Sequence, residues 1–123
     1  MSFLAVGLGG MLGAIARYAI SRLMSAVSTN AFPWGTLIVN IAGCFALGAL
    51  ASVFEKKTAH ATLALFLTTG ILGGFTTFSA FGLETIELIR AEKLTWACLN
   101  VAGSVGLGLF AVVVGRFIFR SAV

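Results

Sequence analysis

Long stretches without Asp, Glu, Lys or Arg dominate this chain and restrict it to a membrane fold. Three of them, residues 23–54, 58–83 and 94–115, exceed the roughly 20 residues that a spanning helix needs. A fourth, residues 1–16, reaches that length if Arg17 lies within the span. The chain is 59% hydrophobic and only 10% charged, outside the range of ordinary soluble domains. We therefore expect an all-α membrane protein whose surroundings are the lipid bilayer, with no nucleic acid as partner.

The segments between these stretches divide the chain into four transmembrane helices of one domain, residues 1–123. Turn-forming residues precede Pro33, which suits the first turn of a second helix, and the polar string EKKTAH separates the second helix from the third. A cleavable signal peptide is the alternative for the N-terminal stretch, but that stretch has no basic region before Arg17. The four expected helices cover about residues 3–24, 33–54, 61–90 and 94–119.

Glycines concentrate in the first predicted helix, in the string GLGGMLG. Gly9 and Gly13 are four residues apart, and this small-xxx-small spacing predicts that another helix approaches closely in lipid. A phosphate-binding loop is the alternative, but no strand precedes the string and no Lys-Ser or Lys-Thr follows it. Helix packing is therefore the favoured interpretation.

The predicted third helix is too long for one straight span, and it contains the string GGFTTFSAF at residues 73–81. Gly73 and Gly74, followed by two β-branched threonines, predict a break in this helix. Non-helical backbone is tolerated at membrane depth only where it is buried in protein or faces water or an ion. Freed carbonyl oxygens suit a hard cation such as Na⁺, whereas freed N–H groups and threonine hydroxyls suit an anion. The break alone does not select between these ions, and a glycine kink repaired by neighbouring helices is a third interpretation.

Side chains near the middle of the spans are candidates for lining an ion route. Asn40 lies in an apolar run, where its carboxamide needs a partner, so it either joins helices or faces a polar pathway. Phe78 and Phe81 are three residues apart and share one face of the helical segment beyond the break. Aromatic side chains in membrane helices mostly serve packing, but the positive edge of a ring attracts an anion. The hydroxyl residues that would extend such a route are Thr77, Ser79 and Ser104.

Two charged residues lie within or beside the predicted spans. Arg17 either extends to the membrane interface together with Tyr18 or attracts anions to a vestibule. Glu84 directly follows the apolar part of the third helix and is a candidate partner for such an arginine. Neither residue is assigned more sharply by its position alone.

The basic residues are balanced across the membrane. With four spans both termini share one side, and four basic residues fall on each side. Orientation is normally set by an excess of Lys and Arg on the cytoplasmic side, so this chain is expected to insert both ways. Two copies in opposite orientation can then pair about a two-fold axis in the membrane plane. The two sets are Lys56, Lys57, Arg116 and Arg120 on the terminal side, and Arg17, Arg22, Arg90 and Lys93 on the other.

Three strings, in this order, resemble the Fluc (CrcB) fluoride channels of bacteria and other microbes. They are GGMLGAIARY at residues 9–18, GTLIVNIAGCFALG at 35–48 and GILGGFTTFSAF at 70–81. The resemblance covers almost the whole chain and implies an antiparallel, dual-topology homodimer in the bacterial plasma membrane. It also implies two pores that export fluoride passively and so reduce its toxicity, with a structural Na⁺ at the dimer interface.

The matched motifs imply roles for individual residues. Phe78 and Phe81 look like the pore phenylalanines of these channels, and Asn40 looks like the pore asparagine. Gly73 and Thr76 look like the residues whose backbone carbonyls hold the central Na⁺ from both subunits.

The resemblance is less specific for the remaining candidates. Arg17 is similar to the first-helix arginine of the family, and Glu84 is similar to its acidic residue after the phenylalanine pair. Ser79 and Ser104 are placed on the polar route by helix position only, because the fourth span carries no matching motif.

A small proton-coupled multidrug-type exporter is the alternative function, since such a protein can also be a dual-topology dimer. Its chemistry needs a carboxylate within a span, and the four acidic residues of this chain are all expected at or near helix ends. Enzyme activity is not expected, because no nucleophile, base and orienting group are placed together.

Overall fold

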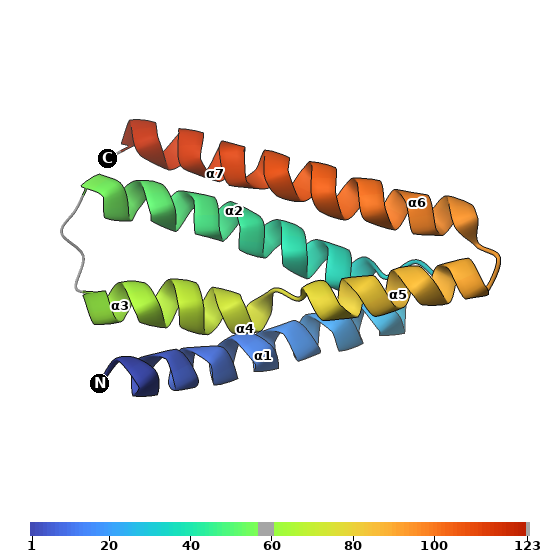
Figure 1. Cartoon of the computed structure of the whole chain (residues 1–123), viewed down its shortest axis with the longest axis horizontal. Helices are drawn as coiled ribbons and strands as arrows, with labels where there is room; N and C mark the ends of the chain where they lie inside the picture. Colours follow the sequence, from blue (N-terminus) through green and yellow to red (C-terminus); the bar gives the residue numbers. More distant parts are fainter. Residues whose placement is uncertain (57–60, 123) are drawn as a thin grey trace.

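A computed structural model describes residues 1–56 and 61–122 of the chain as a bundle of helices (Figure 1). Within these residues, four helices are long and apolar enough to cross a membrane, as expected. The first two spans are the continuous helices α1 (Ser2–Val27) and α2 (Trp34–Lys56). The third consists of α3 (Ala61–Leu65), the π-helical η1 (Phe66–Leu72), α4 (Gly73–Phe75) and α5 (Phe78–Arg90). The fourth consists of α6 (Leu94–Ala102), the π-helical η2 (Gly103–Leu107) and α7 (Gly108–Ala122).

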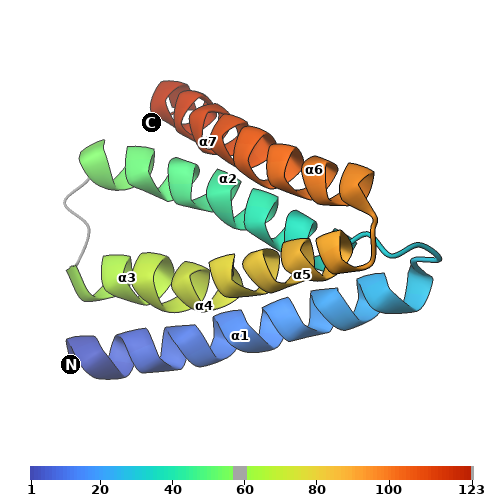
Figure 2. The same cartoon turned by 45° about the vertical axis from the view of Figure 1, so that its right-hand side comes forward.

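The third span lies between α1 and α2 in both views, and the fourth span lies beyond α2 (Figures 1 and 2). The most extensive helix contacts join α2 to α7, and α1 to η1 and α4. Both chain termini lie at the same end of the bundle (Figure 1). This arrangement agrees with an even number of spans. Of the four basic residues assigned to the terminal side, Lys57 lies outside the described residues.

Buried glycines allow α1 to approach the third span closely. A Cβ atom added to Gly9 would lie 2.5 Å from the carbonyl oxygen of Phe66, and one added to Gly13 would lie 2.8 Å from the amide nitrogen of Phe75. Gly74 faces the backbone of Gly10 in the same way. The close packing predicted from the small-xxx-small spacing is therefore confirmed.

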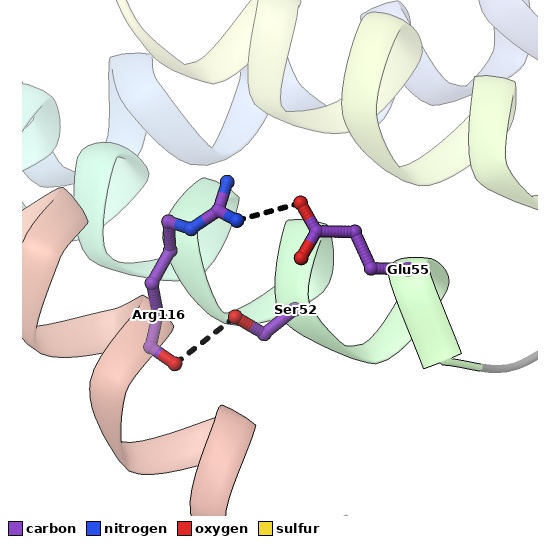
Figure 3. Close-up of polar contacts among 3 residues, drawn as sticks. All are labelled: Ser52, Glu55 and Arg116. Carbon is purple, nitrogen blue, oxygen red and sulfur yellow. Dashed lines mark hydrogen bonds and ion pairs between the residues drawn. The ribbon is translucent and has the colours of Figure 1, made fainter.

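A second close contact joins α2 to α7. A Cβ atom added to Gly48 would collide with the backbone of Val112. Beside this contact, the buried Ser52 hydroxyl donates to the carbonyl oxygen of Arg116 at 3.0 Å (Figure 3). The guanidinium of Arg116 also forms an ion pair of 2.6 Å with Glu55, but both side chains are about half exposed, 44% and 56%. An ion pair of this kind contributes at most about 1 kcal/mol, so backbone packing contributes more to the stability of this contact.

The third span is interrupted at Thr76 and Thr77, and not at the glycine pair. Gly73 has helical dihedral angles, φ −63° and ψ −38°, and Gly74 lies in the same helical turn. Thr76 (ψ 158°) and Thr77 (φ −152°, ψ 119°) are extended. The break predicted for this string is confirmed, and it falls at the two threonines that follow the glycine pair. The physical reason is that Gly74 serves the close contact with α1, while a side chain from α2 ends the helix.

Candidate functional site

The interruption of the third span is bonded to the side chain of Asn40 on α2. The Asn40 carboxamide donates from Nδ2 to the carbonyl oxygen of Thr77 at 3.0 Å. Its Oδ1 accepts a hydrogen bond from the amide of Thr77 at 2.8 Å. Both polar groups of the extended Thr77 backbone are thus satisfied within the membrane, as a non-aqueous environment requires. Of the two interpretations of Asn40, helix joining is directly observed, and one Nδ2 hydrogen remains for another acceptor.

These bonds redirect two amide groups away from their helical acceptors. In a continuous helix, the amide of Thr77 would donate to the carbonyl of Gly73, and the amide of Ala80 to the carbonyl of Thr76. Here the Thr77 amide donates to Asn40, and the Ala80 amide donates to Oγ1 of Thr77 at 3.2 Å. Gly73 and Thr76 are the two residues that the resemblance assigns to Na⁺, and redirected bonding leaves their carbonyl oxygens suited to a hard cation.

A cavity of about 340 Å³ lies beside the interruption. It is bordered by α2, by the third span on both sides of Thr76 and Thr77, and by η2. Two of its walls are π-helical, a geometry that often occurs at functional sites. The cavity brings together most of the predicted site residues: Asn40, Gly73, Thr76, Thr77, Phe78, Phe81 and Ser104.

The two phenylalanines are neighbours but differ in their surroundings. Their ring centroids are 5.4 Å apart and the ring planes are inclined by 47°. Phe81 is only 8% exposed, whereas Phe78 is 83% exposed in the single chain. Phe81 is therefore held by the bundle, and the ring of Phe78 is available to a neighbouring molecule.

The predicted hydroxyl residues divide into two groups. Ser104 lines the cavity, and its Oγ is buried without a hydrogen-bond partner among the described residues. Ser79 does not line the cavity, but its exposed hydroxyl lies 3.3 Å from Oγ1 of Thr77. Ser104 thus carries a buried hydroxyl that no described residue binds, and Ser79 is connected to the cavity wall only through Thr77.

Arg17 and Glu84 do not form the pair that the sequence suggested. The Nε of Arg17 donates to the carbonyl oxygen of Gly74 at 3.2 Å. Oε1 of Glu84 accepts a hydrogen bond of 2.7 Å from the buried hydroxyl of Thr36, and its Oε2 is buried without a partner among the described residues. Each charged side chain is instead hydrogen-bonded to a polar group on a neighbouring helix. Neither residue lines the cavity.

Sequence reasoning missed a buried polar contact of the fourth span. Asn100 is 0% exposed, and its Nδ2 donates to Oγ1 of Thr85 at 2.9 Å. Thr85 in turn donates to the carbonyl oxygen of Phe81 at 2.7 Å. The signal that singled out Asn40, a carboxamide within an apolar run, applies equally to Asn100. The cavity wall also includes Thr68, which the sequence did not single out.

Comparison with known proteins gives a consistent family assignment. The family model described as "CrcB-like protein, Camphor Resistance (CrcB)" matches residues 4–116. A protein of Paracoccus denitrificans named "Fluoride-specific ion channel FluC" is 49% identical over 119 residues, covering 97% of this chain and 94% of the relative. A protein of Ruminiclostridium cellulolyticum with the same name is 43% identical over 122 residues, covering 98% and 94%. The chain therefore belongs to the CrcB family.

Proposed function

We propose that this chain forms a fluoride-selective ion channel that exports cytoplasmic fluoride passively across the plasma membrane of a bacterium. Two relatives that cover nearly the whole chain are named as fluoride-specific ion channels. The observation in the chain itself that carries the proposal is the cavity beside the interrupted third span. It combines a carboxamide, an aromatic pair and a buried hydroxyl among residues of the second, third and fourth apolar spans.

The groups at the cavity suit a small anion that has lost part of its water. Asn40 retains one amide hydrogen, and Ser104 has a hydroxyl that no described residue binds. Phe78 and Phe81 add ring edges, whose partial positive charge attracts an anion and whose apolar bulk excludes water. These donors replace hydration at a few points only, which favours a compact anion in a narrow route.

A structural Na⁺ is part of this proposal, with the carbonyl oxygens of Gly73 and Thr76 as its protein ligands. Their helical donors are redirected to side chains, so both oxygens are suited to a hard cation. The ion would supply a fixed positive charge that links the two chains. It would not move with fluoride.

We further propose that the channel is an antiparallel homodimer with two pores. The balanced basic residues favour insertion in both orientations. Gly73 and Phe78 are exposed in the single chain, so a second copy can complete a cation site and cover the aromatic ring.

The physiological role follows from acid–base chemistry. Hydrogen fluoride is a weak acid that crosses membranes as the neutral molecule and releases fluoride at the neutral pH of the cytoplasm. The released anion is trapped, because it carries charge. A passive channel then allows the negative-inside membrane potential to drive fluoride out, at about 2.3 kcal/mol per elementary charge for every 100 mV.

Efflux from proteoliposomes tests the proposed activity. Vesicles loaded with potassium fluoride and potassium chloride are diluted into an isotonic impermeant salt, valinomycin is added, and fluoride and chloride electrodes record both anions. Rapid fluoride release with chloride retained supports the channel. Absence of fluoride release from folded protein would refute it, and proton-dependent uptake of an organic cation would then favour the exporter.

A further inference from the structure

We propose that Asn40 and Thr77 are positioning residues for the cation site. Their side-chain oxygens accept hydrogen bonds from two backbone amides that would donate to the carbonyls of Gly73 and Thr76 in a continuous helix. Both carbonyls are therefore left free to bind a cation. Neither side chain needs to touch the cation. The inference rests on the proposed Na⁺ site and explains why the two carbonyl oxygens of that site are not bonded within the helix.

The first step is the bond between Asn40 and the Thr77 amide. Oδ1 of Asn40 lies 2.8 Å from this nitrogen, and Nδ2 lies 3.0 Å from the carbonyl oxygen of the same residue. If the carboxamide were absent, the Thr77 N–H would be unsatisfied at membrane depth. The helical acceptor for this N–H is the carbonyl of Gly73, four residues earlier. Loss of Asn40 therefore favours helix closure at the expense of the Gly73 oxygen.

The second step is the hydroxyl of Thr77 at the N-terminus of α5. Oγ1 of Thr77 accepts from the amide of Ala80 at 3.2 Å, an N-cap bond. Without this hydroxyl, the amide of Ala80 would have the carbonyl of Thr76 as its helical acceptor. The hydroxyl of Thr76 is directed to the preceding turn, where it donates to the carbonyl oxygen of Leu72 at 3.0 Å.

These two bonds connect the anion cavity to the cation site. Asn40 and Thr77 both line the cavity, and the carbonyls that they keep free belong to Gly73 and Thr76 in the same wall. A substitution at Asn40 is therefore expected to weaken cation binding as well as anion passage. A residue that acted only as an anion ligand would leave cation binding unchanged.

The test is thermal unfolding of the purified protein in detergent, with NaCl exchanged for KCl at constant ionic strength. The variants Asn40→Leu and Thr77→Val each remove one of the two oxygen acceptors with little change in volume. Controls are Asn100→Leu, which removes a carboxamide from elsewhere in the bundle, and Thr68→Val, which removes another hydroxyl from the same cavity. Neither control side chain bonds to the interruption: the Asn100 carboxamide donates to Thr85, and the Thr68 hydroxyl donates to the carbonyl of Ala64. The backbone carbonyl of Thr68, which accepts from the amide of Gly73, is unchanged in Thr68→Val.

We expect the Na⁺ concentration at half-maximal stabilisation to rise about tenfold in Asn40→Leu and in Thr77→Val. A tenfold change in affinity corresponds to a free energy close to that of one hydrogen bond. Thr77→Ser, which keeps the hydroxyl, should restore it. The two controls should lower the melting temperature without moving the Na⁺ midpoint. The inference is overturned if Asn40→Leu and Thr77→Val keep the Na⁺ midpoint of the unmodified protein. If the unmodified protein itself shows no Na⁺ response, the cation site fails together with this inference, and fluoride efflux still tests the channel separately.

Discussion

Gly13→Ala should destabilise the bundle, because α1 and the third span meet there through backbone atoms. The added Cβ would lie 2.8 Å from the amide nitrogen of Phe75 and 3.0 Å from the carbonyl carbon of Ile71, with the Ile71 oxygen closer still. Backbone atoms cannot rotate away as a side chain can, so the helices must separate. Overpacking of this kind costs about 1–3 kcal/mol, and we expect the upper part of that range. The higher helix propensity of alanine offsets up to about 1 kcal/mol of this steric cost.

Gly7→Ala is the matched control for this prediction. It makes the same substitution in the same helix, but a Cβ at Gly7 would meet no atom of another helix within 4 Å in the part of the chain that the structure describes. The propensity gain is common to both variants, so the difference between their unfolding free energies isolates the steric cost, at about 2–3 kcal/mol. The assay is unfolding in mixed micelles with increasing SDS, at one protein concentration, followed by tryptophan fluorescence. Equal unfolding free energies for the two variants would refute the close-packing argument.

Three further predictions concern the pore, the turn after α5 and the topology. Phe78→Ile and Phe81→Ile should each slow fluoride efflux from liposomes while the protein stays folded; unaltered flux in both would contradict the ring-edge mechanism. Glu92→Gly should raise the unfolding free energy by about 1 kcal/mol, because Glu92 has a φ of 59°. If Glu92→Gly has a lower free energy of unfolding in SDS than the unmodified protein, the positive φ at Glu92 is not a source of strain. Replacing Lys56 and Lys57 by Gln should bias insertion, as measured by labelling of single cysteines from each side; a single orientation already present beforehand would contradict dual insertion.

Glu92 lies at a helix end where glycine is the usual residue. The amide of Lys93 donates to the carbonyl of Leu88 at 2.9 Å, and the amide of Glu92 donates to the carbonyl of Ile89 at 3.0 Å. This pair of bonds is the Schellman motif, which requires the left-handed conformation at Glu92. The motif ends α5 and turns the chain into α6, so its geometry is needed even though the side chain disfavours it.

The spans and the close packing of α1 could be predicted from the sequence because each depends on a local pattern. Charge-free stretches indicate transmembrane helices directly, since a bilayer excludes unpaired charge over that length. The spacing of Gly9 and Gly13 indicates close approach without naming the partner helix. Identifying η1 and α4 as that partner required the three-dimensional arrangement. The pairing of Glu84 with Thr36 was not predictable, because a hydroxyl donor leaves no charge pattern in a sequence.

The position of the helix break shows how two local signals combine into one non-local structure. The glycine pair and the threonines after it predicted a break in this string, but a glycine lowers helix stability only slightly, and Gly74 is retained for packing. The stronger rule is that every polar group at membrane depth needs a partner. Asn40 needed one, and so did an interrupted third span, and these two groups lie 37 residues apart in sequence. A carboxamide, with one donor and one acceptor side by side, matches the N–H and C=O of one extended residue, which is the bonding found at Thr77. The break therefore lies where Asn40 can satisfy it, and the glycines before it determine how closely α1 packs.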